Sequence, residues 1–410
     1  MNILYIDHYA GSDRYGMEFR PFYMAREWVK KGSDVTIIAA DYSHLRRENP
    51  IIKNDFSEEY DSGVRFCFVR SVRYRSNGLK RACSMISFVN KLKQNADYIA
   101  KKYNPDVVIN SSTYPMDVYP AHKIAKIAGA KLFYEIHDLW PMSLVAMSRL
   151  TDKNPLIKYV QKAENYCYKN CDGVVSILPD ADRHIKELGF NNVNFNYVPN
   201  GVVIGESEYA SLNSKHKKVL DDLHKDNKFV VMYAGGHARS NALDCFVECG
   251  KLVSKDTALV LVGNGSEKQK LQSFCEKQNI SNVVFLDAVP KNEMQSLLKE
   301  ADCLYIGAKK SPLYSYGVGM NKMFDYMLSA RPVINGVEAP DTPLELAGCG
   351  ISVPAQNPSE IALAIEKIKN ISPSDREIMG KKGQEYVLAN HRYEVLAEKF
   401  INIISKGENI

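Results

Sequence analysis

Short runs of β-branched residues alternate with longer amphipathic stretches along the whole 410-residue chain. This alternation is typical of parallel strands joined by crossover helices, and it predicts an α/β fold. In the first half, strands are expected at residues 2–7, 34–40, 64–69, 106–110, 131–136, 173–177 and 194–198. The helices expected between them include residues 18–31, 78–103 and 117–128.

The alternation pauses after Pro199-Asn200-Gly201, where a polar stretch rich in Lys and Asp runs to about residue 227. It then restarts, with strands expected at 229–234, 258–262, 283–286, 302–306 and 332–335, and helices at 241–254, 266–278, 291–300, 320–329 and 358–370. We therefore expect two doubly wound Rossmann-like domains, at residues 1–200 and 201–380, facing a central cleft. A last helical pattern, from about 374 to 405, predicts a C-terminal helix in 381–410 that packs on its own domain or crosses back to the first.

The composition, 45% hydrophobic and 25% charged, is that of an ordinary globular protein. Its nine cysteines show neither C-x2-C nor zinc spacing, so we expect reduced thiols in a cytosolic protein. The first apolar run is interrupted by charge too soon for a signal peptide, and no run reaches the ~18 to 20 apolar residues that span a bilayer. Any membrane contact is therefore expected to be peripheral.

Positive charge is concentrated between Arg65 and Lys102, where ten basic residues accompany a single acidic one, Asp97. Such a segment repels itself unless a negative surface screens it, so we expect it to meet anionic lipid or a diphosphate. The residues expected to do so are Arg70, Arg73, Arg75, Lys80 and Arg81. The apolar stripe that follows, 79, 83, 86, 89, 92, 96 and 99, fits a lipid-facing side or a face buried in the core equally well.

Two loops at expected strand ends of the first domain carry polar residues. The loop His8-Tyr9-Ala10-Gly11-Ser12 runs to Gly16 and into a helix, so its backbone N–H groups can approach an anion, although an ordinary turn explains it equally well. The second loop begins His137-Asp138-Leu139-Trp140. It places a titratable group and an aromatic ring at the edge of the sheet, which favours a functional role over a structural one.

Glycine turns recur in the second domain at Gly235-Gly236-His237 and at Gly263-Asn264-Gly265. Arg239 follows the first turn, where it can hold a phosphate or lie in solvent with Ser240 as a helix N-cap. Further on, Lys322 and Asp325 lie at i, i+3 of an expected helix. They form either a surface ion pair or a phosphate-binding amine beside a carboxylate for sugar hydroxyls.

These motifs, taken in order, resemble glycosyltransferase family 4 of the two-domain GT-B fold over nearly the whole chain. The blocks Gly16-Met17-Glu18 and Asp138-Leu139-Trp140-Pro141 are similar to the branch that builds bacterial O-antigen and capsule polysaccharides, including N-acetylfucosaminyltransferase-like members. The resemblance implies a retaining enzyme that moves a hexose or N-acetylated amino sugar from a nucleoside-diphosphate sugar, with UDP as the expected nucleotide, to a surface-polysaccharide or lipopolysaccharide glycan on a lipid carrier. It also implies no metal or other cofactor, no nucleic acid partner, and a peripheral location on the inner face of the cytoplasmic membrane.

The resemblance also implies roles for single residues. Asp325 matches the acidic residue that binds the ribose, and His137 matches a residue near the donor sugar that is Arg in many relatives. Lys322 and Arg239 would neutralise the diphosphate, so His137, Lys322 and Arg239 are the catalytic candidates. The donor-binding residues implied are Gly11, Ser12, Gly235, Gly236, Arg239, Gly263, Gly265, Asn321, Lys322 and Asp325.

Two departures from the family pattern leave alternatives open. Gly317 stands eight residues before Asp325, where the family carries its first acidic residue, and no Lys closely follows Arg239. A GT-B epimerase of nucleotide sugars and a non-catalytic partner protein derived from a transferase therefore remain alternatives. The D-x-D sequence at Asp180-Ala181-Asp182 suggests metal-dependent transferases of another fold, but helix N-capping explains it better.

Overall fold

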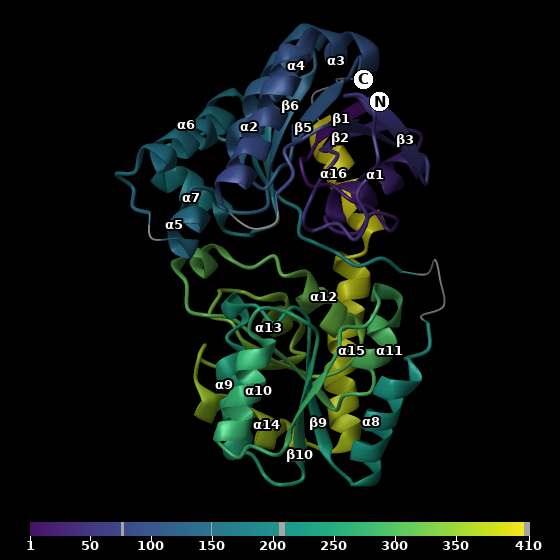
Figure 1. Cartoon of the computed structure of the whole chain (residues 1–410), viewed down its shortest axis with the longest axis vertical. Helices are drawn as coiled ribbons and strands as arrows, with labels where there is room; N and C mark the ends of the chain where they lie inside the picture. Colours follow the sequence, from purple (N-terminus) through teal and green to yellow (C-terminus); the bar gives the residue numbers. More distant parts are fainter. Residues whose placement is uncertain (75–77, 149, 205–209, 406–410) are drawn as a thin grey trace. The chain divides into compact units, whose positions relative to one another are not determined.

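The computed structural model describes residues 1–74, 78–148, 150–204 and 210–405, and the chain divides into two compact units (Figure 1). Unit 1 comprises Met1–Asn200 and Tyr393–Ile410, and unit 2 comprises Gly201–Arg392. Each unit has one sheet of mainly parallel strands, which confirms the expected pair of Rossmann-like α/β folds.

Unit 1 contains an eight-stranded sheet in the order β3-β4-β2-β1-β5-β6-β7-β8. All neighbouring strands are parallel except β3 and β4. The strands are β1 (Asn2–Ile6), β2 (Asp34–Ala40), β3 (Ser57–Asp61), β4 (Val64–Val69), β5 (Val107–Asn110), β6 (Lys131–Ile136), β7 (Gly173–Ser176) and β8 (Phe195–Tyr197).

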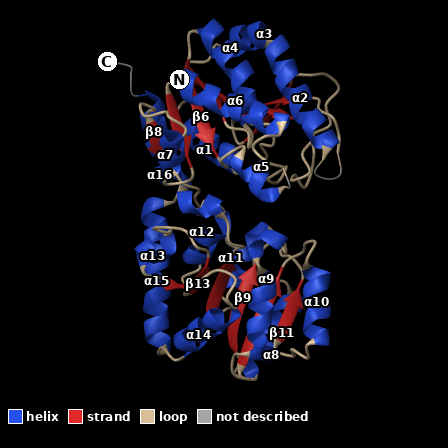
Figure 2. Ribbon diagram, turned by 90° about the vertical axis from the view of Figure 1, so that its left-hand side faces the viewer, coloured by secondary structure: helices blue, strands red, loops and turns tan. Residues whose placement is uncertain are grey.

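Helices cover both faces of this sheet (Figure 2). They are α1 (Arg20–Lys30), α2 (Leu79–Gln94), α3 (Ala96–Tyr103), α4 (Val118–Ala128), α5 (Met142–Met147), α6 (Pro155–Asn170), α7 (Ala181–Glu187) and α16 (Tyr393–Ser405), with a 3₁₀ turn at Pro115–Asp117. The switch in strand order at β1 brings the ends of β1, β5 and β6 together, the place where such sheets bind ligands.

Unit 2 contains six parallel strands in the order β11-β10-β9-β12-β13-β14. They are β9 (Phe229–Ala234), β10 (Thr257–Val262), β11 (Val283–Leu286), β12 (Cys303–Gly307), β13 (Val333–Gly336) and β14 (Gly350–Ser352). The helices are α8 (Ser214–Lys225), α9 (Leu243–Glu248), α10 (Lys268–Lys277), α11 (Met294–Leu298), α12 (Asn321–Leu328), α13 (Pro343–Ala347), α14 (Pro358–Lys369) and α15 (Pro373–Asn390). Short 3₁₀ turns occur at Arg239–Asn241, Cys249–Lys251, Lys291–Glu293 and Pro312–Tyr316.

The core of unit 2 shows why its strands are apolar throughout. Alternate residues of β9 enter two different hydrophobic clusters, one on each face of the sheet. Val230 and Met232 belong to one cluster, and Val231 and Tyr233 to the other. A strand buried on both faces produces a continuous apolar run, and this run made β9 easy to recognise.

The end of the chain differs from the single helix that was expected. The helical pattern is broken at His391 and Arg392, where the backbone N–H of Val202 donates to the carbonyl of His391 at 2.8 Å. Helix α15 belongs to unit 2, whereas α16 belongs to unit 1. There the Trp28 indole N–H donates to the carbonyl of Ala397 at 2.9 Å, and the Trp28 ring lies 5.2 Å from that of Phe400.

All nine cysteines are free thiols, as expected. Seven of them are buried, and only Cys83 is exposed while Cys171 is half-buried. They are therefore mainly core residues of the two units.

Candidate functional site

Unit 2 presents two glycine loops at the carboxyl ends of β9 and β10. These strands are parallel neighbours with Ala234 opposite Val262, so the loops start side by side. A Cβ atom on Gly263 would lie 2.0 Å from the carbonyl oxygen of Gly235, and one on Gly265 would lie 2.5 Å from that of His237. The loops touch through their backbones, and only glycine allows this approach.

The variant Gly263→Ala is expected to lower the free energy of unfolding by roughly 1–3 kcal/mol, because the added methyl group overpacks this contact. Gly236→Ala is the matched control, since nothing lies within 4 Å of its Cβ position. Urea denaturation of the two variants measures the difference. If both unfold at the same urea concentration as the parent protein, the close approach of the loops is not needed for stability.

Lys322 lies beside the first glycine loop. Its ammonium donates to the Tyr233 hydroxyl at 2.9 Å and to Asn241 Oδ1 at 2.8 Å. The Cβ position of Gly235 is 3.8 Å from Lys322 Cε. Burial lowers the pKa of Lys322 to about 8, so an anion placed here would stabilise the charged form.

His237 belongs to the first loop, contacts the second loop at Gly263 and Gly265, and is completely buried. Neither ring nitrogen has a hydrogen-bond partner among the described residues. Burial, reinforced by Lys268 and Lys322, lowers the pKa of His237 to about 4. The imidazole is therefore neutral at pH 7.

Arg239 does not occupy the helix N-terminus that was expected for it. It begins the 3₁₀ turn Arg239–Asn241 and is exposed, while α9 starts only at Leu243. Ser240 is not the N-cap either, because Ala242 takes that position in a left-handed conformation. Asn241, which was not predicted, links the loop to Lys322 and donates to the carbonyl of Gly236 at 2.8 Å.

Asp325 lies one turn after Lys322 on α12, and Asn321 is the exposed first residue of this helix. Burial raises the pKa of Asp325 to about 6, with Lys291 opposing this effect. Since the Lys322 ammonium bonds Tyr233 and Asn241, the surface ion pair with Asp325 is not the arrangement found. Gly317 has a φ of 98°, a conformation that an acidic residue rarely adopts.

In unit 1, His137 follows β6 directly. Its Nε2 lies 2.8 Å from Ser111 Oγ and 3.3 Å from Glu135 Oε2. Burial alone would lower the pKa of His137, but Glu135, followed by Glu18 and Asp7, raises it to about 9. These acidic neighbours therefore favour the cationic form of the imidazole at the carboxyl end of β6.

Glu135 is a site residue that the motifs did not reveal. It is fully buried in β6 and lies 2.9 Å from the guanidinium of Arg20, which is itself 3% exposed. Arg20 also donates to the carbonyl oxygens of Val198 at 2.8 Å and Pro199 at 2.5 Å. A charge inside the apolar run 131–136 was the one sequence signal, because buried charges need partners.

In the loop after β1, the Gly11 N–H and the Ser12 hydroxyl, which were expected to contact a ligand, form hydrogen bonds within unit 1. The Gly11 N–H donates to the carbonyl of Glu18 at 2.7 Å, and a Cβ atom on Gly11 would lie 1.8 Å from the carbonyl oxygen of Gly16. The hydroxyl of Ser12 is buried and donates to Asp61 at 2.6 Å. Both groups therefore have partners within unit 1, and the assignment of Gly11 and Ser12 as donor-binding residues stays a prediction.

The positive charge of the basic segment in unit 1 is partly compensated in the folded structure by acidic residues from other parts of the chain. Four of its ten basic residues pair with acidic residues from outside the segment, namely Arg65 with Asp34, Arg70 and Lys91 with Asp55, and Lys102 with Glu58. Two more lie over aromatic rings: Arg73 over Tyr42, and Arg81 over Tyr9. Lys80 is exposed, and Arg75 lies outside the described residues. Acidic partners thus screen four of the ten basic residues, of which only Arg70 is among the five expected to meet lipid.

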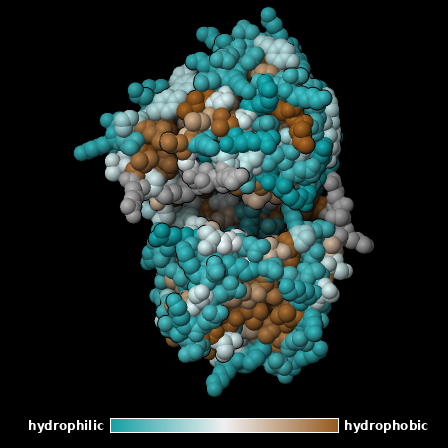
Figure 3. Space-filling view, viewed as in Figure 1, coloured by the Kyte–Doolittle hydropathy of each residue, from teal (hydrophilic) through white to brown (hydrophobic). Residues whose placement is uncertain are grey.

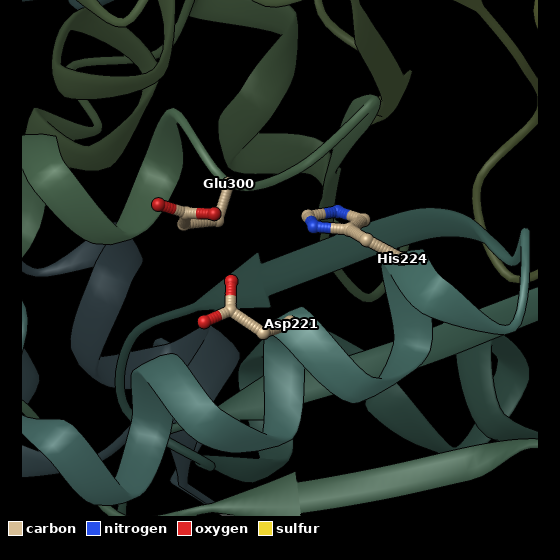
Figure 4. Close-up of side chains that lie close together, drawn as sticks. All are labelled: Asp221, His224 and Glu300. Atoms are coloured by element: carbon tan, nitrogen blue, oxygen red, sulfur yellow. The ribbon is translucent and has the colours of Figure 1, made fainter.

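Three potential metal ligands, Asp221, His224 and Glu300, lie together in unit 2 (Figure 4). Their ligand atoms lie within 4.8 Å of one another. The Lys217 ammonium contacts Asp221 at 2.9 Å and Glu300 at 3.0 Å, so the two carboxylates already share a cation. We assign no function to this cluster.

The D-x-D sequence Asp180-Ala181-Asp182 lies at the start of α7. Asp180 occupies the N-cap position without a side-chain capping hydrogen bond, and Asp182 pairs with Lys186 at 2.7 Å. Helix placement thus agrees with the N-cap interpretation, although the capping bond is not formed. Within the described ranges, none of the helices is long and apolar enough to cross a membrane.

Comparisons with known proteins agree with this architecture. Residues 15–205 match the model of Glycosyltransferase Family 4, and residues 228–370 match that of Glycosyl transferases group 1. The putative colanic acid biosynthesis glycosyl transferase WcaI of Escherichia coli K12 is 23% identical over 219 residues, which are 51% of this chain and 52% of that protein. The match therefore spans about half the length of this relative.

Two solved structures share the fold over almost their whole length. Sucrose-phosphate synthase from Thermosynechococcus elongatus has a TM-score of 0.71 at 16% identity, covering 98% of this chain and 97% of the other. Anabaena HepE in complex with UDP and glucose has a TM-score of 0.68 at 14% identity, covering 99% and 100%. Both family models and both sheets lead to one assignment: the chain belongs to the glycosyltransferases of the GT-B fold, with a family 4 region in unit 1 and a group 1 region in unit 2.

Proposed function

We propose that this glycosyltransferase transfers a hexose or N-acetylated amino sugar, with retention, from a UDP-linked donor to a polysaccharide on a lipid diphosphate. The observation that carries the proposal is the Lys322 ammonium beside the glycine loop of unit 2. Phosphate oxygens can accept hydrogen bonds from such an amine. HepE, solved with UDP and glucose, and WcaI, a putative transferase of polysaccharide biosynthesis, support the donor and the acceptor class.

In this proposal, Lys322 and the loops at Gly235 and Gly263 hold the diphosphate, and the Asp325 carboxylate accepts hydrogen bonds from the ribose. His137 interacts with the donor sugar. Arg239 is exposed, so we assign it only a supplementary contact with the phosphates. The N-acetylfucosaminyltransferase-like branch, O-antigen or capsule as product, and metal independence belong to the same proposal.

Incubation of the purified protein with a panel of UDP-sugars tests this function. Release of UDP, by transfer or by slow hydrolysis, is expected and should persist in EDTA. Conversion of the donor sugar into its epimer would instead show a nucleotide-sugar epimerase. Binding of UDP without any turnover would show the non-catalytic protein that Gly317 suggests.

Lys322→Met is expected to weaken UDP binding about 10- to 100-fold, because a charged hydrogen bond contributes roughly 1.5 to 3 kcal/mol. Lys381→Met is the control, since Lys381 is an exposed lysine of unit 2 paired with Glu377. Calorimetric titration with UDP measures both dissociation constants. Unchanged affinity in Lys322→Met would remove the diphosphate assignment.

We further propose that the exposed side of α2 docks on an anionic bilayer. The structure divides the apolar stripe of this helix: Met85, Phe88 and Leu92 are buried in the core, while Leu79 and Ile86 are exposed by 87% and 55%. Figure 3 shows apolar residues among hydrophilic ones over this side of unit 1. Lys80 adds a positive charge beside Leu79, which suits an anionic surface.

The triple variant Leu79→Gln, Ile86→Gln, Lys80→Gln is expected to reduce partitioning into anionic vesicles at least about tenfold, because two inserted apolar side chains and one charge are lost. Leu363→Gln, on an exposed apolar residue of α14, is the control. Co-sedimentation at low and high salt measures the effect, which should be smaller with neutral vesicles. Equal partitioning of the triple variant and the control would refute docking through α2.

A further inference from the structure

Glu135 gathers donors from four separate places in unit 1. The hydroxyl of Tyr5 on β1 and the guanidinium of Arg20 on α1 both donate to it. The Ser111 hydroxyl, just after β5, donates to Oε2 at 2.5 Å. The fourth group is His137, whose Nε2 lies 3.3 Å from the same oxygen. A carboxylate with this many donors stays ionised, and its pKa is held far below the usual value.

These contacts determine which nitrogen of the His137 ring faces Ser111 and Glu135 and which one is left for a ligand. Because the Ser111 hydroxyl gives its proton to Glu135, its oxygen can only accept from His137 Nε2, 2.8 Å away. Nε2 therefore carries a hydrogen in every protonation state. Nδ1, at the other side of the ring, has no hydrogen-bond partner in the described part of the chain, so it is the nitrogen left for a ligand.

The charges around His137 then determine whether Nδ1 is a hydrogen-bond donor or an acceptor. Acidic groups from three further positions lie near the ring: Asp7 directly after β1, Glu18 in the loop before α1, and the neighbouring Asp138. Burial raises the pKa of Asp7 to about 7 and that of Asp138 to about 6, and His137 opposes both shifts. The Arg20 guanidinium is bonded to Glu135 and to the segment 198–200. The surroundings thus favour an imidazolium, which presents an N–H donor at Nδ1 in place of a lone pair.

We propose that Glu135 is a positioning residue that keeps His137 in the imidazolium form, with Nε2 turned inward through Ser111 and Nδ1–H offered to the bound sugar. This inference rests on the function proposed above for His137. It makes His137 a hydrogen-bond donor to a sugar hydroxyl or to developing negative charge, and it removes the role of general base at neutral pH.

The first test is a ¹H–¹³C NMR titration of the histidine rings in the full chain, with the His137 signal assigned by its loss in His137→Gln. In the parent protein, His137 is expected to titrate more than one pH unit above an ordinary histidine. Titration at or below pH 6.5 would overturn the proposal. This measurement uses a variant only to assign the signal, and it requires no turnover.

The second test is Glu135→Gln, which keeps the shape of the side chain but removes the charge. The titration of His137 should move down by at least one pH unit, while exposed His224 in unit 2 stays unchanged as a control. Glu135→Asp keeps the charge and should restore part of the shift. If Gln is tolerated and His137 titrates as before, Glu135 has only a structural role.

Turnover supplies an independent readout. The basic limb of the kcat profile should lie near the titration of His137 and move to lower pH in Glu135→Gln, with KM for the donor changed less than kcat. A raised titration point with no turnover on any donor would refute the proposed function alone. A basic limb that stays in place while the NMR titration moves would overturn the positioning role.

Discussion

Arg20→Met is expected to lower the free energy of unfolding by about 3–5 kcal/mol, because breaking a buried ion pair leaves the remaining charge without full compensation. Arg20 and Glu135 are 3% and 0% exposed, so water cannot replace the lost guanidinium. The variant also removes the donors to the carbonyl oxygens of Val198 and Pro199. Methionine keeps much of the side-chain volume, so the loss is mainly electrostatic.

Arg14→Met is the matched control for this prediction. Arg14 pairs with Glu59 at 3.1 Å, but the two side chains are 55% and 29% exposed. A pair in such contact with water contributes less than about 1 kcal/mol. Urea denaturation, followed by circular dichroism, compares the two variants with the parent protein. If both variants lose a similar free energy of unfolding, the buried Arg20–Glu135 pair contributes no more to stability than the exposed Arg14–Glu59 pair.

The strands that could be predicted are those buried on both faces. β9 was placed correctly at both ends, since residues 229–234 are all buried and form a continuous apolar run. β3 was missed, because its sequence Ser-Glu-Glu-Tyr-Asp belongs to a charged edge strand with alternating exposure. α8 was missed for a similar reason: only His216 and Leu220 are buried in it, so no apolar face stood out.

In the candidate site, too, some residues could be predicted from local sequence patterns and others could not. The glycine turns and Lys322 were recognisable, since glycine between a strand and a helix is a local signal. The partners of Lys322 were not, because Tyr233 looks like any core residue of β9. The Glu135 network was also hidden, as Tyr5 and Arg20 lie more than a hundred residues away along the chain. The acidic partners of the basic segment were hidden as well, because Asp34, Asp55 and Glu58 all precede that segment in the sequence.

His137→Ala is expected to reduce kcat roughly 100- to 1,000-fold, the usual effect of removing one fixed donor from a charge-stabilising site. The dissociation constant of UDP should stay the same, because the residues proposed to hold the nucleotide belong to unit 2. Steady-state kinetics with the donor identified in the UDP-sugar assay, together with calorimetry on UDP, separates the two effects.

His137→Arg distinguishes the chemistry of this residue from its mere presence. Arginine cannot act as a base at neutral pH, but it remains a cationic N–H donor, so the variant should retain far more activity than His137→Ala. His122→Ala is the control: His122 on α4 bonds the Tyr166 hydroxyl of α6 at 2.7 Å and takes no part in the contacts of Glu135, so its loss should leave kcat unchanged. If His137→Arg and His137→Ala are equally inactive, His137 does not act in catalysis as a cationic hydrogen-bond donor. If all three variants turn over normally, His137 is a structural residue.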